Sequence, residues 1–375
     1  MGLMFSNRVT ALAGVLTAAF ALHAQKPPES KDVLVFADGE RLVGKFERSN
    51  GGSVVFKSDV IGEITVDWSK VKELTTSQAF AAIPKGILLK KNGDTSKVPE
   101  GSIAFADQKV TVTPATGQPQ TVAVADTDHL IDKDTFDKEM RQNPGFLASW
   151  TGTVTAGASL VEGTQVSKTF NGAINLVSLI PDTDWLQRRN RTTVTFSTTY
   201  GTLEQPSTPT VKTSIYHGGF ERDEYFSSAF YAFAQASFDH NFSQGLSLQQ
   251  TYGGGIGWSA IRRPNESLDL KASATYIRQE FYASASDHRL AGAAAEEDFS
   301  RNLWRGSKFT EQLVLSPALT NSNVFTALAN AALTIPAYKR LNVTLGTTDN
   351  YLNDPPPGAK KNSYQATLGL SYSLR

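Results

Sequence analysis

Asp239 and His240 are the residues whose types and spacing come closest to a catalytic pair in this chain. A histidine beside a carboxylate acts as a general base when a nucleophile lies within hydrogen-bonding reach. Ser243 and His217 are available in principle as further members of such a site. Serine and aspartate are common on any polar strand surface, so a structural role is the favoured interpretation of these residues.

Glu296, Glu297 and Asp298 form a small acidic cluster that could bind a divalent cation. A solvated loop or strand end explains the same three residues, and we favour that interpretation. The remaining histidines show no metal-ligand spacing such as His-x-x-x-His; they are His23, His129 and His288.

Residues 253–257 contain four glycines and superficially resemble a phosphate-binding loop. Such a loop joins a strand to a helix, whereas this run lies inside an alternating segment with no helix after it. A structural role is therefore predicted, at a place where a strand bends or packs tightly. The sequence contains no convincing catalytic, cofactor-binding or metal-binding constellation, so neither enzymatic activity nor a cofactor is expected.

Two groups of arginines lie at expected strand ends, one within residues 188–191 and one at Arg262 and Arg263. They could line a pore mouth, meet anionic lipid headgroups or act as ordinary solvated turn charges. The chain has a formal net charge of zero and no basic stripe. No nucleic-acid partner is therefore expected.

Alternating side chains dominate the chain after residue 150 and are clearest in residues 361–375. There an apolar face alternates with a polar face, which predicts a half-apolar strand. The apolar face holds Tyr364, Ala366, Leu368, Leu370, Tyr372 and Leu374, and the polar face holds Ser363, Gln365, Thr367, Gly369, Ser371 and Ser373. Twelve strands are predicted at about 150–161, 165–180, 189–201, 210–221, 225–239, 245–260, 266–282, 287–301, 306–316, 322–335, 339–351 and 361–374. Weak alternation in two of them leaves ten strands as an alternative.

The predicted strands favour a transmembrane β-barrel over a soluble sandwich or sheet. Many span about 11 to 16 residues, whereas soluble strands average about five or six and membrane strands need about nine to eleven. Tight connections, such as a turn predicted at 221–224, alternate with longer ones. Aromatic residues lie at predicted strand ends, at Trp150, Tyr200, Tyr225, Phe226, Phe281, Tyr282, Tyr338 and Tyr351. Because every backbone polar group in lipid needs a partner, such a sheet must close. The fold class expected is all-β: an antiparallel transmembrane barrel preceded by a small duplicated β domain.

The region before the barrel has the features of an exported β domain. Residues 1–24 have the charge and apolar run of a signal peptide, with cleavage expected after Ala21 or Ala24. Residues 25–131 contain two repeats, at about 33–74 and 87–131, and residues 132–149 form a linker or short helix. The first repeat resembles Sm-like small barrels in shape, although export argues against an RNA-binding role. Cysteine is absent, so neither a disulfide nor a lipid anchor through cysteine is expected.

The region from Trp150 onward resembles the family called domain of unknown function 481, whose members are outer-membrane proteins. The resemblance covers about 225 residues and implies a barrel in the outer membrane but no activity. It departs from the family pattern at Gly163-Thr164, where Gly-Asn is usual. The matching motifs are Trp150-x-Gly152, Gly157, Glu162-Gly163, Phe220-Glu-Arg222-Asp223-Glu-Tyr225 and Gly253-Gly-Gly255-Ile-Gly257-Trp258.

The expected location is the bacterial outer membrane, with the N-terminal domain in the periplasm. Thr367, Gly369, Tyr372 and Leu374 resemble the C-terminal signal read by the outer-membrane assembly machinery, although the chain ends on arginine rather than an aromatic residue. A structural or passive-transport role is expected, with outer-membrane lipid, the assembly machinery and a periplasmic protein or peptidoglycan as partners. An outer-membrane hydrolase acting on lipid or peptide and a secreted binding module remain the alternatives.

Overall fold

The computed structural model describes residues 31–142, 149–162, 165–263, 265–283, 287–321 and 324–374. The predicted signal peptide and the Gly163-Thr164 motif lie outside these ranges. The chain divides into two compact units, one of residues 1–85 and 99–133 and the other of residues 86–98 and 134–375. Within the described ranges, no helix is both long enough and apolar enough to span a bilayer.

The first unit contains one nine-stranded sheet whose element order repeats. Three strands, a 3-10 turn and a fourth strand occur twice, first as β2–β5 and again as β6–β9. This order supports a duplication. The strands are β1 (Asp32–Phe36), β2 (Arg41–Asn50), β3 (Ser53–Ser58), β4 (Gly62–Asp67), β5 (Val71–Pro84), β6 (Glu100–Ala106), β7 (Lys109–Thr113), β8 (Gln120–Ala123) and β9 (Thr127–Asp132), and the turns are η1 (Trp68–Lys70) and η2 (Val124–Asp126).

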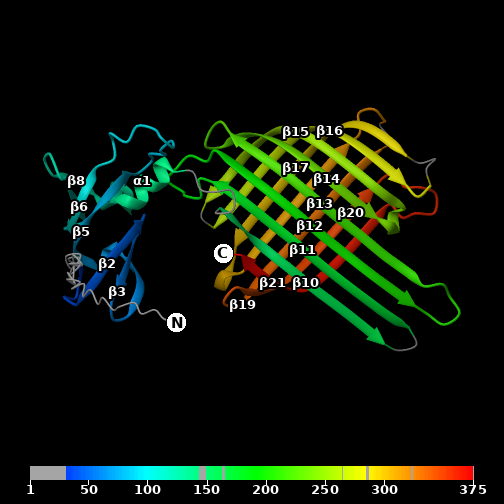
Figure 1. Ribbon diagram of the computed structural model, residues 1–375, viewed down its shortest axis with the longest axis horizontal. Helices are drawn as coiled ribbons and strands as arrows, with labels where there is room; N and C mark the ends of the chain where they lie inside the picture. The colour runs from blue at the N-terminus through cyan, green and yellow to red at the C-terminus, as the bar shows by residue number, and fades with distance from the viewer. Residues whose placement is uncertain are drawn as a thin grey trace, which may run out of the picture. The chain divides into compact units, whose positions relative to one another are not determined.

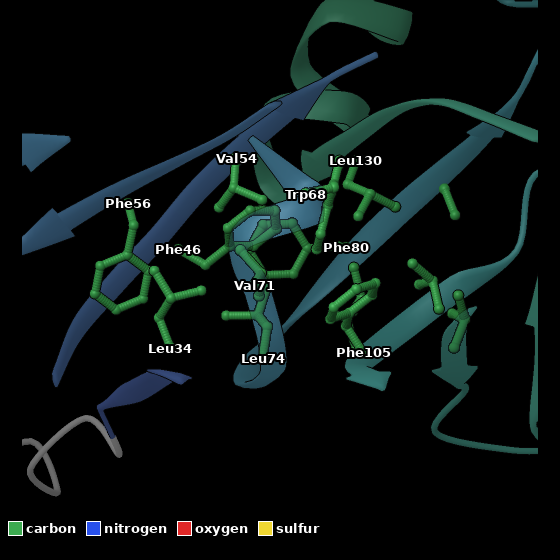
Figure 2. Packing of buried hydrophobic residues seen from close by; sticks show 14 residues of the cluster. Leu34, Phe46, Val54, Phe56, Trp68, Val71, Leu74, Phe80, Phe105 and Leu130 are labelled. Atoms are coloured by element: carbon green, nitrogen blue, oxygen red, sulfur yellow. The ribbon is translucent and has the colours of Figure 1, made fainter. Parts of the chain in front are cut away.

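Both repeats contribute to one hydrophobic core (Figure 2). The rings of Phe46 and Phe80 pack in a tilted arrangement with centroids 4.7 Å apart, and Trp68 packs on Phe105 of the second repeat at 4.5 Å. The indole N–H of Trp68 donates to Ser49 Oγ at 3.0 Å, which satisfies the polar atom of this buried side chain. Two sequence repeats could each have formed a small sheet of their own, but they do not. The two halves share one sheet and one core because β5 pairs with strands of both.

The second unit is a closed barrel of twelve antiparallel strands, as predicted (Figure 1). The last strand pairs with the first, with Gly152 opposite Leu374 and Ala156 opposite Leu370. The alternative of ten strands is excluded. The strands are β10 (Trp150–Glu162), β11 (Val166–Ile180), β12 (Asn190–Glu204), β13 (Val211–Tyr225), β14 (Phe230–Asn241), β15 (Leu246–Arg263), β16 (Glu266–Phe281), β17 (His288–Asn302), β18 (Lys308–Pro317), β19 (Phe325–Tyr338), β20 (Leu341–Leu352) and β21 (Asn362–Leu374).

The barrel has two ends, which we name from the positions of its first and last strands. The proximal end is where β10 begins and β21 ends, and the distal end is the opposite one. The predicted turn at 221–224 is wrong, because these residues continue β13 and the chain reverses after Tyr225. A run of charged residues resembles a turn, but inside a barrel it can also supply the polar inner face of a strand.

The outer face of the barrel is apolar and exposed, whereas part of its inner face is polar and buried. On β21, Leu368 and Leu370 are 63% and 56% exposed, while Ser371 is 1% exposed. Exposed aromatic side chains lie towards both ends; examples are Phe226, Trp304 and Tyr338 at the proximal end and Tyr282 and Tyr364 at the distal end. Phe281, predicted among the surface aromatics, is instead buried with Leu246 and Leu352.

A short helix and a loop also belong to the second unit. The helix α1 (Lys133–Arg141) lies within the predicted linker, and the ring of Phe136 stacks on that of Trp185 at 5.3 Å. The amide of Leu89 donates to the carbonyl of Trp185 at 3.1 Å. These contacts cover the connection between β11 and β12 with buried apolar side chains.

Candidate functional site in the barrel lumen

Arg191 occupies the centre of a charged network inside the barrel. Its Nε donates to Asp223 on the neighbouring strand at 2.6 Å, and its Nη1 donates to Asp269 on β16, also at 2.6 Å. Its Nη2 donates to the hydroxyl of Tyr231 at 3.2 Å. Since β12 and β16 are four strands apart, the guanidinium links distant parts of the barrel wall.

Lys271 forms the second centre of this network. Its Nζ lies 2.8 Å from Glu221, 2.9 Å from Glu296 and 2.9 Å from Asp298. The lysine side chain is 3% exposed, so water provides little compensation for its charge. Glu296 and Asp298 are on the adjacent strand β17, whereas Glu221 is on β13, three strands away, so the ion pair between Lys271 and Glu221 crosses part of the lumen.

We call these seven residues the lumen cluster; they are Arg191, Glu221, Asp223, Asp269, Lys271, Glu296 and Asp298. Five carboxylates surround two cations, so the cluster carries an excess of formal negative charge. Lysine and arginine occupy the space between the carboxylates, and no group of side chains suited to a metal ion occurs in the described part of the chain.

The lumen cluster revises two interpretations of the sequence. Glu296, Glu297 and Asp298 lie inside β17 and not in a solvated loop. Glu296 and Asp298 point inwards to Lys271, while Glu297 lies on the outer face opposite Leu270 and Leu313. Of the arginines at 188–191, Arg191 is no solvated turn charge, because it binds carboxylates within the barrel.

Two glycines of residues 253–257 lie where a side chain would overlap a neighbour. A Cβ on Gly257 would overlap the ring of Tyr231, and a Cβ on Gly255 would overlap the backbone of Ala272. Tyr231 is fully buried, and its ring also lies under the Arg191 guanidinium at 5.3 Å. The predicted structural role of this glycine run is consistent with these contacts, because Gly257 leaves room for Tyr231 at the lumen cluster and Gly255 allows the close approach of the neighbouring strand.

Asp239 and His240 do not form a catalytic pair, because adjacent strand residues point to opposite faces. Asp239 faces the lumen and lies 2.6 Å from Nδ1 of His217, which is directly opposite on β13. Thr195 Oγ1 lies 3.4 Å from Nε2 of His217. His240 is on the outer face, where its ring packs on Tyr216 at 5.6 Å. His217 and Asp239 therefore belong to the polar wall of the lumen.

The distal end of the lumen is crossed by a hydrogen-bonded bridge. Gln244, in the turn η3 (Phe242–Gln244), donates from Nε2 to the carbonyls of Asn350 at 3.1 Å and Lys361 at 3.0 Å. These partners are on β20 and the loop after it, across the barrel from β14 and β15. Ser243 lies in the same turn, and its hydroxyl donates to Asn241 Oδ1 at 2.6 Å. Its hydroxyl therefore does not form the predicted site with a histidine.

A polar wall on β10, β11 and β12 remains open to water. Ser159, Asn175 and Ser197 face the lumen and are exposed, and Thr153 and Thr195 beside them are half-buried. The opposite wall, on β13 to β17, carries the other six residues of the lumen cluster and is largely buried, and Arg191 reaches them from the proximal end of β12. The lumen is therefore filled on one side and lined by neutral hydroxyl and amide groups on the other.

The four residues of the predicted assembly signal lie on both faces of β21. Thr367 and Gly369 point inwards, and Thr367 Oγ1 donates to the carbonyl of Gly346 at 3.4 Å. Tyr372 and Leu374 lie on the outer face, opposite Val154 and Gly152 of β10. Recognition of this segment by an assembly machinery stays a prediction.

Comparison with known proteins shows the family of the barrel region. The family described as "Protein of unknown function, DUF481" matches residues 154–374, which is more than half of the chain. The chain belongs to this family. The resemblance predicted from the sequence is thus confirmed, and DUF481 membership by itself assigns no activity.

The solved structures that match this DUF481 protein have low sequence identity and a low TM-score. The translocator domain of the autotransporter NalP from Neisseria meningitidis is 10% identical with a TM-score of 0.33, and the match covers 60% of this chain and 87% of that one. The β domain of the Bordetella autotransporter BrkA is 11% identical with a TM-score of 0.28, covering 60% and 98%. No curated protein shows significant sequence similarity to the chain.

Proposed function

We propose that this protein is an outer-membrane β-barrel that provides a narrow, cation-preferring passage for small polar solutes. Twelve strands return the chain to the side of the membrane on which it entered, and we place that side, with the N-terminal β domain, in the periplasm. That domain is then available to contact a periplasmic protein or peptidoglycan.

The observation that carries the membrane assignment is the inverted distribution of side chains in the barrel. Apolar side chains such as Ile256, Leu368 and Leu370 are among the most exposed in the unit, while polar ones such as Gln279 and Lys271 are buried. A water-soluble barrel would place its apolar face inwards. An outer apolar band with aromatic residues near both edges matches a barrel surrounded by lipid.

The observation that supports a passage is the difference between the two lumen walls. The exposed wall on β10 to β12 carries uncharged polar groups, which suit water and small polar solutes. The excess carboxylates of the lumen cluster face the same interior and favour cations over anions. A small and cation-preferring conductance is therefore expected.

Single-channel recording tests this passage, with a variant that narrows it. Purified folded protein in planar bilayers should give a small conductance, with a reversal potential shifted towards that of potassium in a KCl gradient. Ser197→Trp should lower the conductance because it fills the exposed wall. Phe196→Trp is the matched control, since Phe196 is the adjacent residue on the outer face and is 43% exposed.

Two results would contradict the transport proposal. The first is repeated insertion of folded wild-type protein with no measurable conductance, which would make the barrel only a membrane anchor for the N-terminal domain. Equal conductance of Ser197→Trp and Phe196→Trp would also show that ions do not pass along the β10 to β12 wall.

A further inference from the structure

Two arginines face each other on the outer surface near the distal end of the barrel. Arg278 on β16 is directly opposite Arg289 on β17. Both lie on the outer face, because the flanking residues Ile277, Gln279 and Leu290 are buried in the barrel. Like charges directly opposite each other destabilise a sheet. An anion bound between the two guanidinium groups would remove that repulsion.

Two carboxylates lie beside the two arginines, and within the described ranges neither is paired with Arg289. Arg278 Nη2 lies 2.5 Å from Glu280, and Asp287 accepts the backbone N–H of Phe281 at 2.8 Å. Arg289 is exposed, and within the described ranges it has no ion-pair partner. A cavity of about 220 Å³ is lined by Arg278, Gln279, Glu280, Asp287, His288 and Arg289. This volume is several times the roughly 30 Å³ that one water molecule occupies in the liquid.

The arginine pair lies just beyond an exposed aromatic pair. Tyr252 and Tyr276 are directly opposite each other on β15 and β16, two residues closer to the middle of the barrel. They are 41% and 45% exposed. Aromatic side chains of membrane barrels lie at the boundary between hydrocarbon and headgroups. Arg278 and Arg289 would therefore lie at the level of lipid headgroups.

We propose that Arg278 and Arg289 bind a phosphate group of a membrane lipid at the distal rim of the barrel. Guanidinium groups bind phosphate through two parallel hydrogen bonds, which lysine cannot do. Basic pockets at this depth recognise lipid headgroups in other membrane proteins. The inference rests on the proposed membrane location. With the proximal end on the periplasmic side, the distal end lies in the outer leaflet. The lipid expected to supply the phosphate group there is lipid A.

Native mass spectrometry of the purified, folded full-length protein in neutral detergent tests this site, with lipid A as the probe. Wild type should retain lipid A, and Arg289→Ala should lower its affinity about tenfold, as expected for losing hydrogen bonds to a charged group. Arg278→Ala/Arg289→Ala should lower it further. Arg301→Ala is the matched control, because Arg301 lies on the same face of β17 at the proximal end.

The outcomes separate this inference from the proposed function. Equal affinity of wild type and the double variant for lipid A would overturn the site, as would full displacement of lipid A by inorganic phosphate or equal binding of dephosphorylated lipid A. Heat-modifiable migration and conductance are measured on the same samples. If both persist while lipid A binding is unaffected by the substitutions, only the lipid site fails.

Discussion

Lys271→Met is expected to prevent stable folding of the barrel. The substitution keeps most of the side-chain volume but leaves Glu221, Glu296 and Asp298 facing one another without their shared cation. Removing one partner of a buried ion pair costs about 3–5 kcal/mol, and here three carboxylates lose the same partner. The folded fraction, measured by heat-modifiable gel migration and by urea titration, should fall sharply.

Two further variants identify the cause of that loss. Lys339→Met is the control, because Lys339 is at the exposed end of β19, where its ammonium lies 5.1 Å from the ring centroid of Tyr338. It should fold like wild type. Lys271→Met combined with Glu221→Gln and Glu296→Gln should recover part of the lost stability. A fully stable Lys271→Met protein would contradict the ion-pair network described for the lumen.

Gly257→Ala is expected to have the second-largest effect on folding. The added Cβ would overlap the ring of Tyr231, which is fixed by its hydrogen bond with Arg191. Overpacking of this kind typically costs about 1–3 kcal/mol and occasionally more. We expect a lower urea midpoint for unfolding and a smaller folded fraction at the same expression level.

Gly254→Ala is the matched control, three residues earlier in the same strand. Its added Cβ would meet nothing nearer than the carbonyl of Phe233 at 3.4 Å, which is ordinary contact. This variant should therefore keep wild-type stability. If both variants lost stability equally, the glycines would matter for strand flexibility and not for the space that Tyr231 needs.

Most of the barrel was predictable because an outer lipid face and an inner polar face impose period 2 on every strand. β21 is the clearest case, since its predicted apolar residues Leu368 and Leu370 are indeed the exposed ones. Even the weakly alternating segment at 287–301 forms β17 (His288–Asn302), in which Gly292 lies where a Cβ would overlap the carbonyl of Pro317.

The lumen cluster was not predictable from the sequence. Glu221 and Asp223 look like turn residues when considered locally, and their compensating cations Arg191 and Lys271 are about 30 to 50 residues away. The pairing depends on which strands the closed barrel brings together across the lumen. Glu221 and Asp223 are two residues apart, as side chains on one face of a strand are. This spacing was the one local signal that they face the lumen together.

Strand pairing also explains why Asp239 and His240 do not form the site that their adjacency suggested. Adjacency in sequence suggested a shared site, yet a strand separates neighbouring side chains onto opposite faces. The partner of Asp239 is His217, which is 22 residues earlier in the chain and directly opposite on β13. Only the strand register reveals such a pair.

The most direct test of the central claim uses the absence of native cysteine in the chain. Single cysteines are introduced at Ile174 on the outer face and at Asn175 on the exposed lumen wall, and isolated outer membranes are treated with a water-soluble maleimide. If the barrel spans the membrane and water fills the lumen beside this wall, Asn175→Cys should react and Ile174→Cys should react only after denaturation. Equally fast labelling of both cysteines in intact membranes would contradict this expectation, because the apolar outer face would then contact water.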